Sequence, residues 1–230
     1  MKKPLKFVID GKQVTFFKNE DKGAPIIYAN MHTEVGHSVI AQCKKLGCRP
    51  FHLVSITSLR WDEELSPWAH DPVVSKSDHF TGEANHYVRC MTDKIIPFIE
   101  DKIKPPTCRI IAGYSMGGLF ALYAPYITDA FTGSVSASGS VWYPEFVSYA
   151  KEHNFLQKPE AIYLSLGDLE SRAKNPFLSQ TENCMKELYS VYQRKAIESV
   201  FELNPGNHYK DVPYRLAKGI TWMLRECLHF

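Results

Sequence analysis

The chain turns from a strand into a helix within one stretch, Arg109-Ile110-Ile111-Ala112-Gly113-Tyr114-Ser115-Met116-Gly117-Gly118-Leu119-Phe120. An apolar run precedes the turn and small and apolar residues follow it, which is typical of a buried strand leading into a helix. The five residues from Gly113 to Gly117 match the pattern G-x-S-x-G. Glycine is needed on both sides because larger side chains would collide with neighbouring elements. The pattern predicts that Ser115 stands exposed at the tip of a sharp turn.

Ser115 is therefore the candidate nucleophile. Met116 begins the predicted helix, where backbone amides lack helical partners and the helix dipole favours negative charge. We expect the Met116 N–H to donate to the oxyanion of a tetrahedral intermediate. A bare G-x-S-x-G also occurs in turns without catalytic function. A catalytic role for Ser115 therefore requires a base and an acid elsewhere in the chain.

Strands and helices alternate on both sides of this stretch. Residues 5–9 and 13–17 are predicted to form an antiparallel hairpin around the turn Asp10-Gly11. The remaining order predicts a mostly parallel sheet with helices on both faces, so ligands should bind beyond the carboxyl ends of the strands. The expected strands are 25–29, 51–57, 108–112, 133–137, 161–166 and 200–203, and the expected helices are 35–46, 83–103, 116–126, 176–193 and 214–228. Residues 58–82 are expected to form a long, mostly irregular loop.

Length and composition suit one domain over residues 1–230, without a large inserted lid. The 27 Lys+Arg and 25 Asp+Glu residues give a net charge of +2, which offers no concentrated basic face for nucleic acid or a membrane surface. The start Met1-Lys2-Lys3-Pro4 lacks the apolar run of a signal peptide, and no stretch is long enough for a membrane helix. Six scattered cysteines favour reduced thiols and a cytoplasmic location. They are Cys43, Cys48, Cys90, Cys108, Cys184 and Cys227.

The candidate base is His208, one of nine histidines. It ends the segment Asn204-Pro205-Gly206-Asn207-His208, between the last expected strand and the last expected helix. Neutral imidazole at this place can take the proton of a serine hydroxyl and return it to a leaving group. His153 and His229 are expected to be solvated and His52 to lie in the core. His70, His79 and His86 flank the long loop and could line the pocket, but no spacing of a metal site joins them. We expect neither a catalytic metal nor another cofactor.

The chain resembles the "Putative esterase" family of α/β-hydrolases over nearly its whole length. The resemblance is carried by Gly-Tyr-Ser-Met-Gly-Gly at 113–118, by Pro-Gly-Asn-His at 205–208, and by the tryptophans, prolines and Phe-Thr-Gly of 61–82. That family includes enterochelin esterases, feruloyl esterases, S-formylglutathione hydrolases and mycolyltransferases. The resemblance implies an α/β-hydrolase fold and a triad in the chain order Ser, acid, His.

Two carboxylates compete for the role of the acid, Asp168 and Glu170, in the loop after the strand 161–166. In related esterases a glycine at the strand end is often followed by the acid three positions later, and Gly167 places Glu170 there. Asp168 is better suited to accept hydrogen bonds from turn amides. The longer side chain of Glu170 can also reach across the loop to orient the imidazole. Glu170 is the prediction and Asp168 the alternative.

Similarity to the mycolyltransferases implies a second oxyanion donor after the strand 25–29. Their Asp-Gly-Leu segment corresponds here to Met31-His32-Thr33, which makes the Thr33 amide the candidate although His32 replaces the family's glycine. Five aromatic side chains in loops on the active face are the predicted substrate-binding residues: Trp61, Trp68, Phe80, Trp142 and Tyr143. They would suit an aromatic or apolar acyl group, although they could instead form core beneath a long loop.

These features predict a serine hydrolase that cleaves a small-molecule carboxylic ester through an acyl-serine intermediate. A thioesterase or an acyltransferase could use the same residues, because the fold does not choose between them. A non-catalytic binding protein on a hydrolase scaffold is the alternative from another class. The sequence leaves the oligomeric state open.

Overall fold

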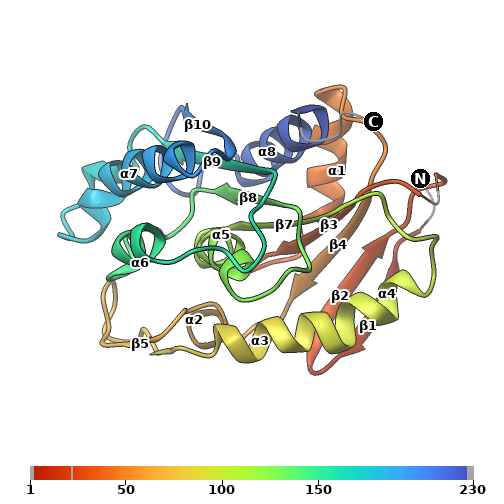
Figure 1. The fold of residues 1–230 in the computed structure, drawn as a ribbon, viewed down its shortest axis with the longest axis horizontal. Coiled ribbons are helices and arrows are strands. Elements are labelled where there is room, and N and C mark those ends of the chain that lie inside the picture. The colour runs from red at the N-terminus through yellow and green to blue at the C-terminus, as the bar shows by residue number, and fades with distance from the viewer. Residues whose placement is uncertain (1–2, 22, 227–230) are drawn as a thin grey trace.

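A computed structural model describes residues 3–21 and 23–226, and an eight-stranded sheet runs through its centre (Figure 1). The strand order is β1-β2-β4-β3-β7-β8-β9-β10. Strand β2 pairs antiparallel with β1 on one side and β4 on the other, and every later pair of neighbours is parallel. The strands are β1 (Leu5–Ile9), β2 (Lys12–Phe17), β3 (Ile26–Asn30), β4 (His52–Thr57), β7 (Arg109–Tyr114), β8 (Gly133–Ala137), β9 (Ala161–Gly167) and β10 (Glu198–Asn204).

The N-terminal hairpin forms as its turn residues predict. Asp10 and Gly11 have φ of 52° and 77°, the left-handed pair that a two-residue hairpin turn needs. The parallel strands β3, β4, β7, β8 and β9 are buried along almost their whole length because helices cover both of their faces, whereas the edge strand β10 is mostly half-buried. This arrangement confirms the predicted fold class, an α/β-hydrolase sheet with an antiparallel hairpin at its amino-terminal edge.

Helices pack on both faces of the sheet. On one face lie α1 (Gly36–Lys45) and α8 (Val212–Glu226), which run side by side in Figure 1. The apolar side chains of the other face pack with five other helices. These are α3 (Ala84–Cys90), α4 (Ile96–Glu100), α5 (Met116–Tyr123), α6 (Phe146–Glu152) and α7 (Thr181–Arg194).

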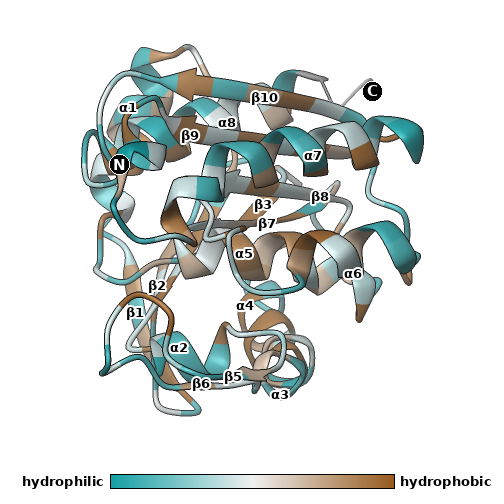
Figure 2. Cartoon of the chain, turned by 90° about the vertical axis from the view of Figure 1, so that its left-hand side faces the viewer, coloured by the Kyte–Doolittle hydropathy of each residue, from teal (hydrophilic) through white to brown (hydrophobic). Residues whose placement is uncertain are grey.

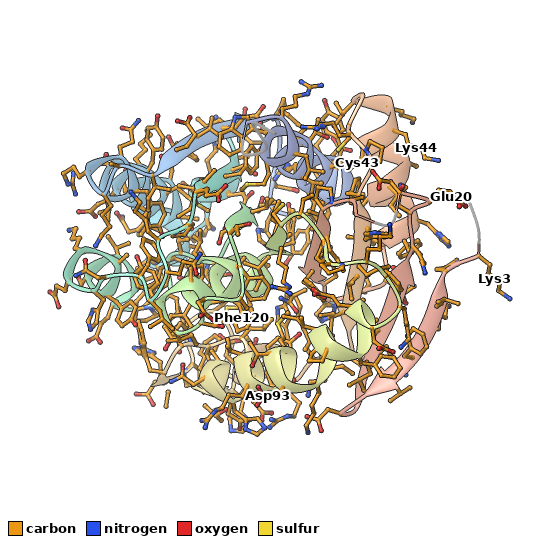
Figure 3. The ribbon with its side chains drawn as sticks, turned by 45° about the vertical axis from the view of Figure 1, so that its right-hand side comes forward. Lys3, Glu20, Cys43, Lys44, Asp93 and Phe120 are labelled. Atoms are coloured by element: carbon orange, nitrogen blue, oxygen red, sulfur yellow. The ribbon has the colours of Figure 1, made fainter. Side chains whose placement is uncertain are left out.

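The helices divide their residues between core and solvent. Figure 2 shows both hydrophilic and hydrophobic segments along α7, as expected for a helix between a sheet and water. In Figure 3, Phe120 of α5 lies inside the molecule, whereas Lys44 of α1 points away from it. On α1 the neighbouring Cys43 faces the other way, and its thiol contacts the Ala217 carbonyl of α8 at 3.9 Å. The sheet is thus enclosed by amphipathic helices.

Three local predictions were wrong or incomplete. The segment 58–82 is more regular than expected, because it contains the short helix α2 (Trp61–Glu64) and a small ladder of β5 (Ala69–His70) with β6 (Phe80–Thr81). Buried Glu64 anchors α2 through an ion pair with Lys12 Nζ at 2.6 Å. Helix α7 begins at Thr181 rather than near 176, after a 3-10 turn, and α6 was not predicted.

Some predicted features lie outside the described residues, namely Cys227, His229 and the last residues of the helix expected to reach 228. Among the described residues, the cysteines 43, 48, 90, 108 and 184 are free thiols. Within the same part of the chain, no helix is both long and apolar enough to cross a membrane.

Candidate active site

Ser115 occupies a strained turn between β7 and α5. Its backbone φ of 57° and ψ of −125° lie in a region that non-glycine residues rarely adopt. The flanking glycines are needed for close contact. A Cβ on Gly113 would lie 2.2 Å from the Gly117 carbonyl, and one on Gly117 would lie 2.5 Å from the Asn30 carbonyl oxygen. The turn can therefore form only with glycine at these two positions.

The hydroxyl of Ser115 lies 3.3 Å from Ser140 Oγ. Within the described residues it does not hydrogen-bond to His208, although both side chains line the same cavity. Catalytic hydrogen bonds are often long or unformed without substrate and tighten when it binds. Met116 is the first residue of α5 and also lines the cavity; that its amide is an oxyanion donor stays a prediction.

Glu170 and His208 form a direct pair, although 38 positions separate them in the sequence. Glu170 Oε2 accepts a hydrogen bond from His208 Nδ1 at 2.7 Å. The other oxygen, Oε1, accepts from the Gly167 amide at 2.6 Å and from Ser138 Oγ at 2.8 Å. Because a carboxylate only accepts, Nδ1 of the neutral imidazole carries the proton and Nε2 is left as the basic nitrogen.

Burial alone would raise the pKa of Glu170. The hydrogen bonds from His208, Ser138 and the Gly167 amide outweigh that cost and hold its pKa below its ordinary value. The competing carboxylate, Asp168, is exposed and accepts from the Gly206 amide at 2.7 Å. It thus ties the loop that carries His208 to the end of β9, as turn aspartates commonly do.

A cavity of about 490 Å³ opens beyond the carboxyl ends of the parallel strands and contains these groups. Its size is within the range of pockets for small molecules. Burial, together with the nearby Asp78 and Glu63 carboxylates, raises the pKa of the lining residue Asp62. The side chains around the cavity carry both signs of charge and are otherwise largely apolar. They include Trp61, Asp62, Val74, Asp78, Phe80, Ser138, Ser140, Trp142, Leu169, Arg172, Leu178 and Tyr209.

The five predicted aromatic residues separate into two groups. Trp61, Phe80 and Trp142 line the cavity. Trp68 and Tyr143 do not line it. Their rings pack against each other with centroids 6.0 Å apart, and each side chain donates a hydrogen bond to a backbone carbonyl. Tyr143 donates to the Trp68 carbonyl at 2.6 Å, and Trp68 Nε1 donates to the Pro144 carbonyl at 3.2 Å. These two rings join the segment 58–82 to the loop after β8.

Thr33 is exposed and is not among the residues that line the cavity. Its neighbour His32 lies closer to the site, with its ring 5.3 Å from that of Trp61. The segment between β3 and α1 therefore reaches the cavity wall through His32, and a role for the Thr33 amide stays a prediction.

Sequence reasoning missed several polar groups at the site. Ser138 and Ser140 belong to the stretch Ser136-Ala137-Ser138-Gly139-Ser140, directly after β8 and beside β7. Their place at a strand end could have marked them. Buried Arg215 of α8 is also at the site, 3.0 Å from Glu170 Oε1. Arg215 could not be identified from the sequence, because a charged residue of an amphipathic helix usually faces water.

A family model described as "Putative esterase" matches residues 53–211, which is more than half of the chain and includes Ser115, Glu170 and His208. The chain belongs to this esterase family. The match confirms the resemblance noted in the sequence and makes the protein an enzyme that acts on esters. Within the described residues, no cluster of three His, Cys, Asp or Glu side chains could hold a metal ion.

The esterase is similar to a curated protein and to solved structures. It is 30% identical over 173 residues to the uncharacterized protein YbbA of Bacillus subtilis strain 168, covering 70% of this chain and 68% of YbbA. The siderophore hydrolase EstB from Aspergillus nidulans superposes with a TM-score of 0.81 at 16% identity, covering 100% of this chain and 98% of EstB. The enterobactin hydrolase IroE, solved in complex with DFP, gives 0.74 at 18% identity, with 97% and 94% covered.

Proposed function

We propose that this esterase is a serine hydrolase with Ser115 as nucleophile, His208 as general base and Glu170 as the acid of the triad. One observation carries the proposal. The buried Glu170 carboxylate holds His208 Nδ1 at 2.7 Å, and that imidazole lines the same cavity as the strained Ser115. Asp168 is the less suitable acid, because its carboxylate is exposed and already bonded to a turn amide.

In the proposed reaction, Ser115 Oγ attacks the ester carbonyl while His208 Nε2 takes the hydroxyl proton. The carbonyl oxygen becomes an oxyanion, which the Met116 amide at the start of α5 stabilises. Collapse of the tetrahedral intermediate breaks the bond to the alcohol, which leaves with the proton from His208. Water then repeats these steps on the acyl-serine and releases the carboxylic acid. The Thr33 amide remains our candidate for a second oxyanion donor.

The cavity supports a carboxylic ester with an aromatic or apolar acyl group as substrate. Trp61, Phe80 and Trp142 offer flat apolar surface in the same cavity that Ser115 and His208 line. The proteins of similar fold include hydrolases of siderophores, so siderophore-type esters belong in the first substrate panel. Since the walls carry Asp62 and Asp78 as well as Arg172, we expect neutral esters to be preferred over strongly anionic ones.

The proposal is tested by labelling with a fluorophosphonate, which forms a stable covalent adduct with an activated serine. We expect one adduct on the intact protein by mass spectrometry, and peptide mapping should place it on Ser115. Labelling should persist in Ser140→Ala, a matched change of another serine in the cavity, and vanish in Ser115→Ala. An unlabelled wild-type protein, or a label at another residue, would refute the acyl-serine mechanism.

A second prediction separates the cavity wall from the core beneath it. Trp61→Ala should lower kcat/KM for an aryl-acyl nitrophenyl ester, relative to the acetate ester, by about tenfold or more, because the small acyl group touches little of the wall. Trp68→Ala is the matched control. Since Trp68 does not line the cavity, this change should lower the melting temperature and leave the ratio of the two kcat/KM values unchanged. Equal shifts of that ratio in both variants would show that the cavity does not select the acyl group through Trp61.

A further inference from the structure

Arg215 is a charged side chain in the interior, with only 1% of its surface exposed. It projects from the first turns of α8 toward the carboxyl ends of β7 and β9. Arginine is almost never fully buried unless paired, because taking the guanidinium out of water costs several kcal/mol. The groups that contact the buried guanidinium must therefore compensate for this cost.

One side of the guanidinium holds the acid. Arg215 Nη1 donates to Glu170 Oε1 at 3.0 Å and to Ser138 Oγ at 3.0 Å, and Ser138 in turn donates to the same carboxylate oxygen. With the Gly167 amide, these donors occupy Oε1. The carboxylate cannot rotate without losing them, so Oε2 stays directed at His208.

The other side of the guanidinium holds the loop of the base. Arg215 Nη2 donates to the carbonyl oxygens of Pro205 at 3.2 Å and Asn207 at 3.0 Å. Nη1 also lies 3.3 Å from the hydroxyl of Tyr114, which donates to the His208 carbonyl at 2.7 Å. The backbone of His208 is thus fixed through Tyr114, the residue that precedes the nucleophile.

The end of β9 is shaped to admit this side chain. A Cβ on Gly167 would lie 2.9 Å from both terminal nitrogens of Arg215 and 2.3 Å from the Gly206 carbonyl oxygen. Lysine would not reproduce these contacts, because its three donors share one nitrogen, whereas Glu170 and the two carbonyls accept from two separate nitrogens of the guanidinium. The planar fork matches acceptors that lie on two different loops.

We propose that Arg215 is a positioning residue of the active site, whose one guanidinium fixes both the Glu170 carboxylate and the loop that carries His208. The inference rests on the proposed triad. It also has an electrostatic consequence. When His208 takes the serine proton, the Glu170 carboxylate faces two cations, and Arg215 weakens its attraction for the new imidazolium. Loss of the arginine charge therefore strengthens the Glu170–imidazolium pair.

The pH dependence of the reaction is set by the groups around His208. Glu170 and Arg215 act on it from the 3-10 turn after β9 and from α8, and Tyr114 acts from β7. Asp168 lies beside the loop of His208, bonded to the Gly206 amide. The other titratable or charged side chains lining the cavity are Asp62, Asp78, Arg172 and Tyr209. A substitution of Arg215 alters none of the other charges in this set.

The test compares Arg215→Lys, which keeps the charge without the fork, with Arg215→Gln, which removes both. We expect each variant to lose about 10- to 100-fold in kcat on an acetate ester, with KM nearly unchanged, because the triad is misplaced. In Arg215→Gln alone, the pH at half-maximal kcat/KM should rise by about half a unit or more. Arg225→Gln, on the exposed side of the same helix, should behave like the wild type.

Tyr114→Phe covers the case in which both Arg215 variants fail to fold, because it removes only the hydroxyl between Arg215 and the His208 carbonyl. It should fold and lose about 3- to 10-fold in kcat, which corresponds to the free energy of about one hydrogen bond. Unchanged kcat in this variant, or an Arg215→Gln protein with the wild-type rate and pH profile, would overturn the inference.

Fluorophosphonate labelling separates the failure of this inference from the failure of the proposed triad. Without a label on Ser115 of the wild type, the triad itself fails. If the wild type is labelled on Ser115 and the folded Arg215 variants are labelled at the same rate as the wild type, only the positioning role of Arg215 fails.

Discussion

Ser115→Ala is expected to lower kcat for nitrophenyl acetate by at least about 10⁴-fold, as losses of a nucleophile do in other serine hydrolases. The residual rate should come from the Met116 amide and from binding in the cavity. The fold should persist, since the one hydrogen-bond contact of the hydroxyl within the described residues is that of 3.3 Å with Ser140, and alanine is no more strained than serine in this turn. Steady-state kinetics and thermal unfolding by circular dichroism measure the two parts separately.

Ser140→Ala is the matched control for that prediction, because Ser140 is buried beside Ser115 and lines the same cavity. It should lose less than about tenfold in kcat, the range of a single hydrogen bond. If Ser115→Ala kept more than a few per cent of the activity, or if Ser140→Ala lost more than Ser115→Ala, the nucleophile would have to be reassigned.

Glu170→Gln is expected to lower kcat at neutral pH by about 10²- to 10⁴-fold, because an amide can favour the wrong tautomer of His208. Asp168→Asn should cost less than about tenfold, since an asparagine oxygen can still accept from the Gly206 amide. The comparison is made by kcat on one ester under one set of conditions. A larger loss in Asp168→Asn than in Glu170→Gln would transfer the acid to Asp168.

Glu170→Gln is also expected to change the stability of the fold. The pKa of Glu170 is lower in the folded protein than its ordinary value, so its ionisation stabilises the fold above that ordinary value. This contribution is lost as the pH falls through the folded pKa. Glu170→Gln should therefore be less sensitive to acidification between neutral and acid pH than the wild type. It should also melt earlier at neutral pH, because Arg215 loses its buried counter-charge.

The elbow was predictable because all of its constraints are local. Gly113, Ser115 and Gly117 lie within five positions, and the strand and helix around them have patterns that a short window reveals. The parallel sheet followed from the alternation of such windows. His208 and Glu170 were placed by their loops after strands and by chain order, so their prediction needed the topology and the family resemblance but no side-chain contacts.

The remaining site could not be predicted because it depends on contacts between distant segments. Arg215 reads as a solvent-facing residue of α8 until Glu170 and the carbonyls of 205–207 are placed around it. Trp61 and Trp68 look equivalent in sequence, yet only Trp61 lines the cavity, since Trp68 packs against Tyr143 of another loop. Helix α6 was missed for a local reason, because it follows Glu145 in a left-handed conformation without a side-chain cap.

The backbone of Ser115 bears on how this protein can evolve. A non-glycine residue held at φ of 57° and ψ of −125° costs on the order of 1–3 kcal/mol, a sizeable share of the stability of an ordinary domain. That cost is tolerated only because β7, β8 and α5 hold the turn in place. Selection for thermal stability alone would favour glycine at 115, which would remove the nucleophile that we propose. A lineage that keeps serine there must compensate elsewhere, so the exposed faces of its helices are where stabilising substitutions can accumulate without touching catalysis.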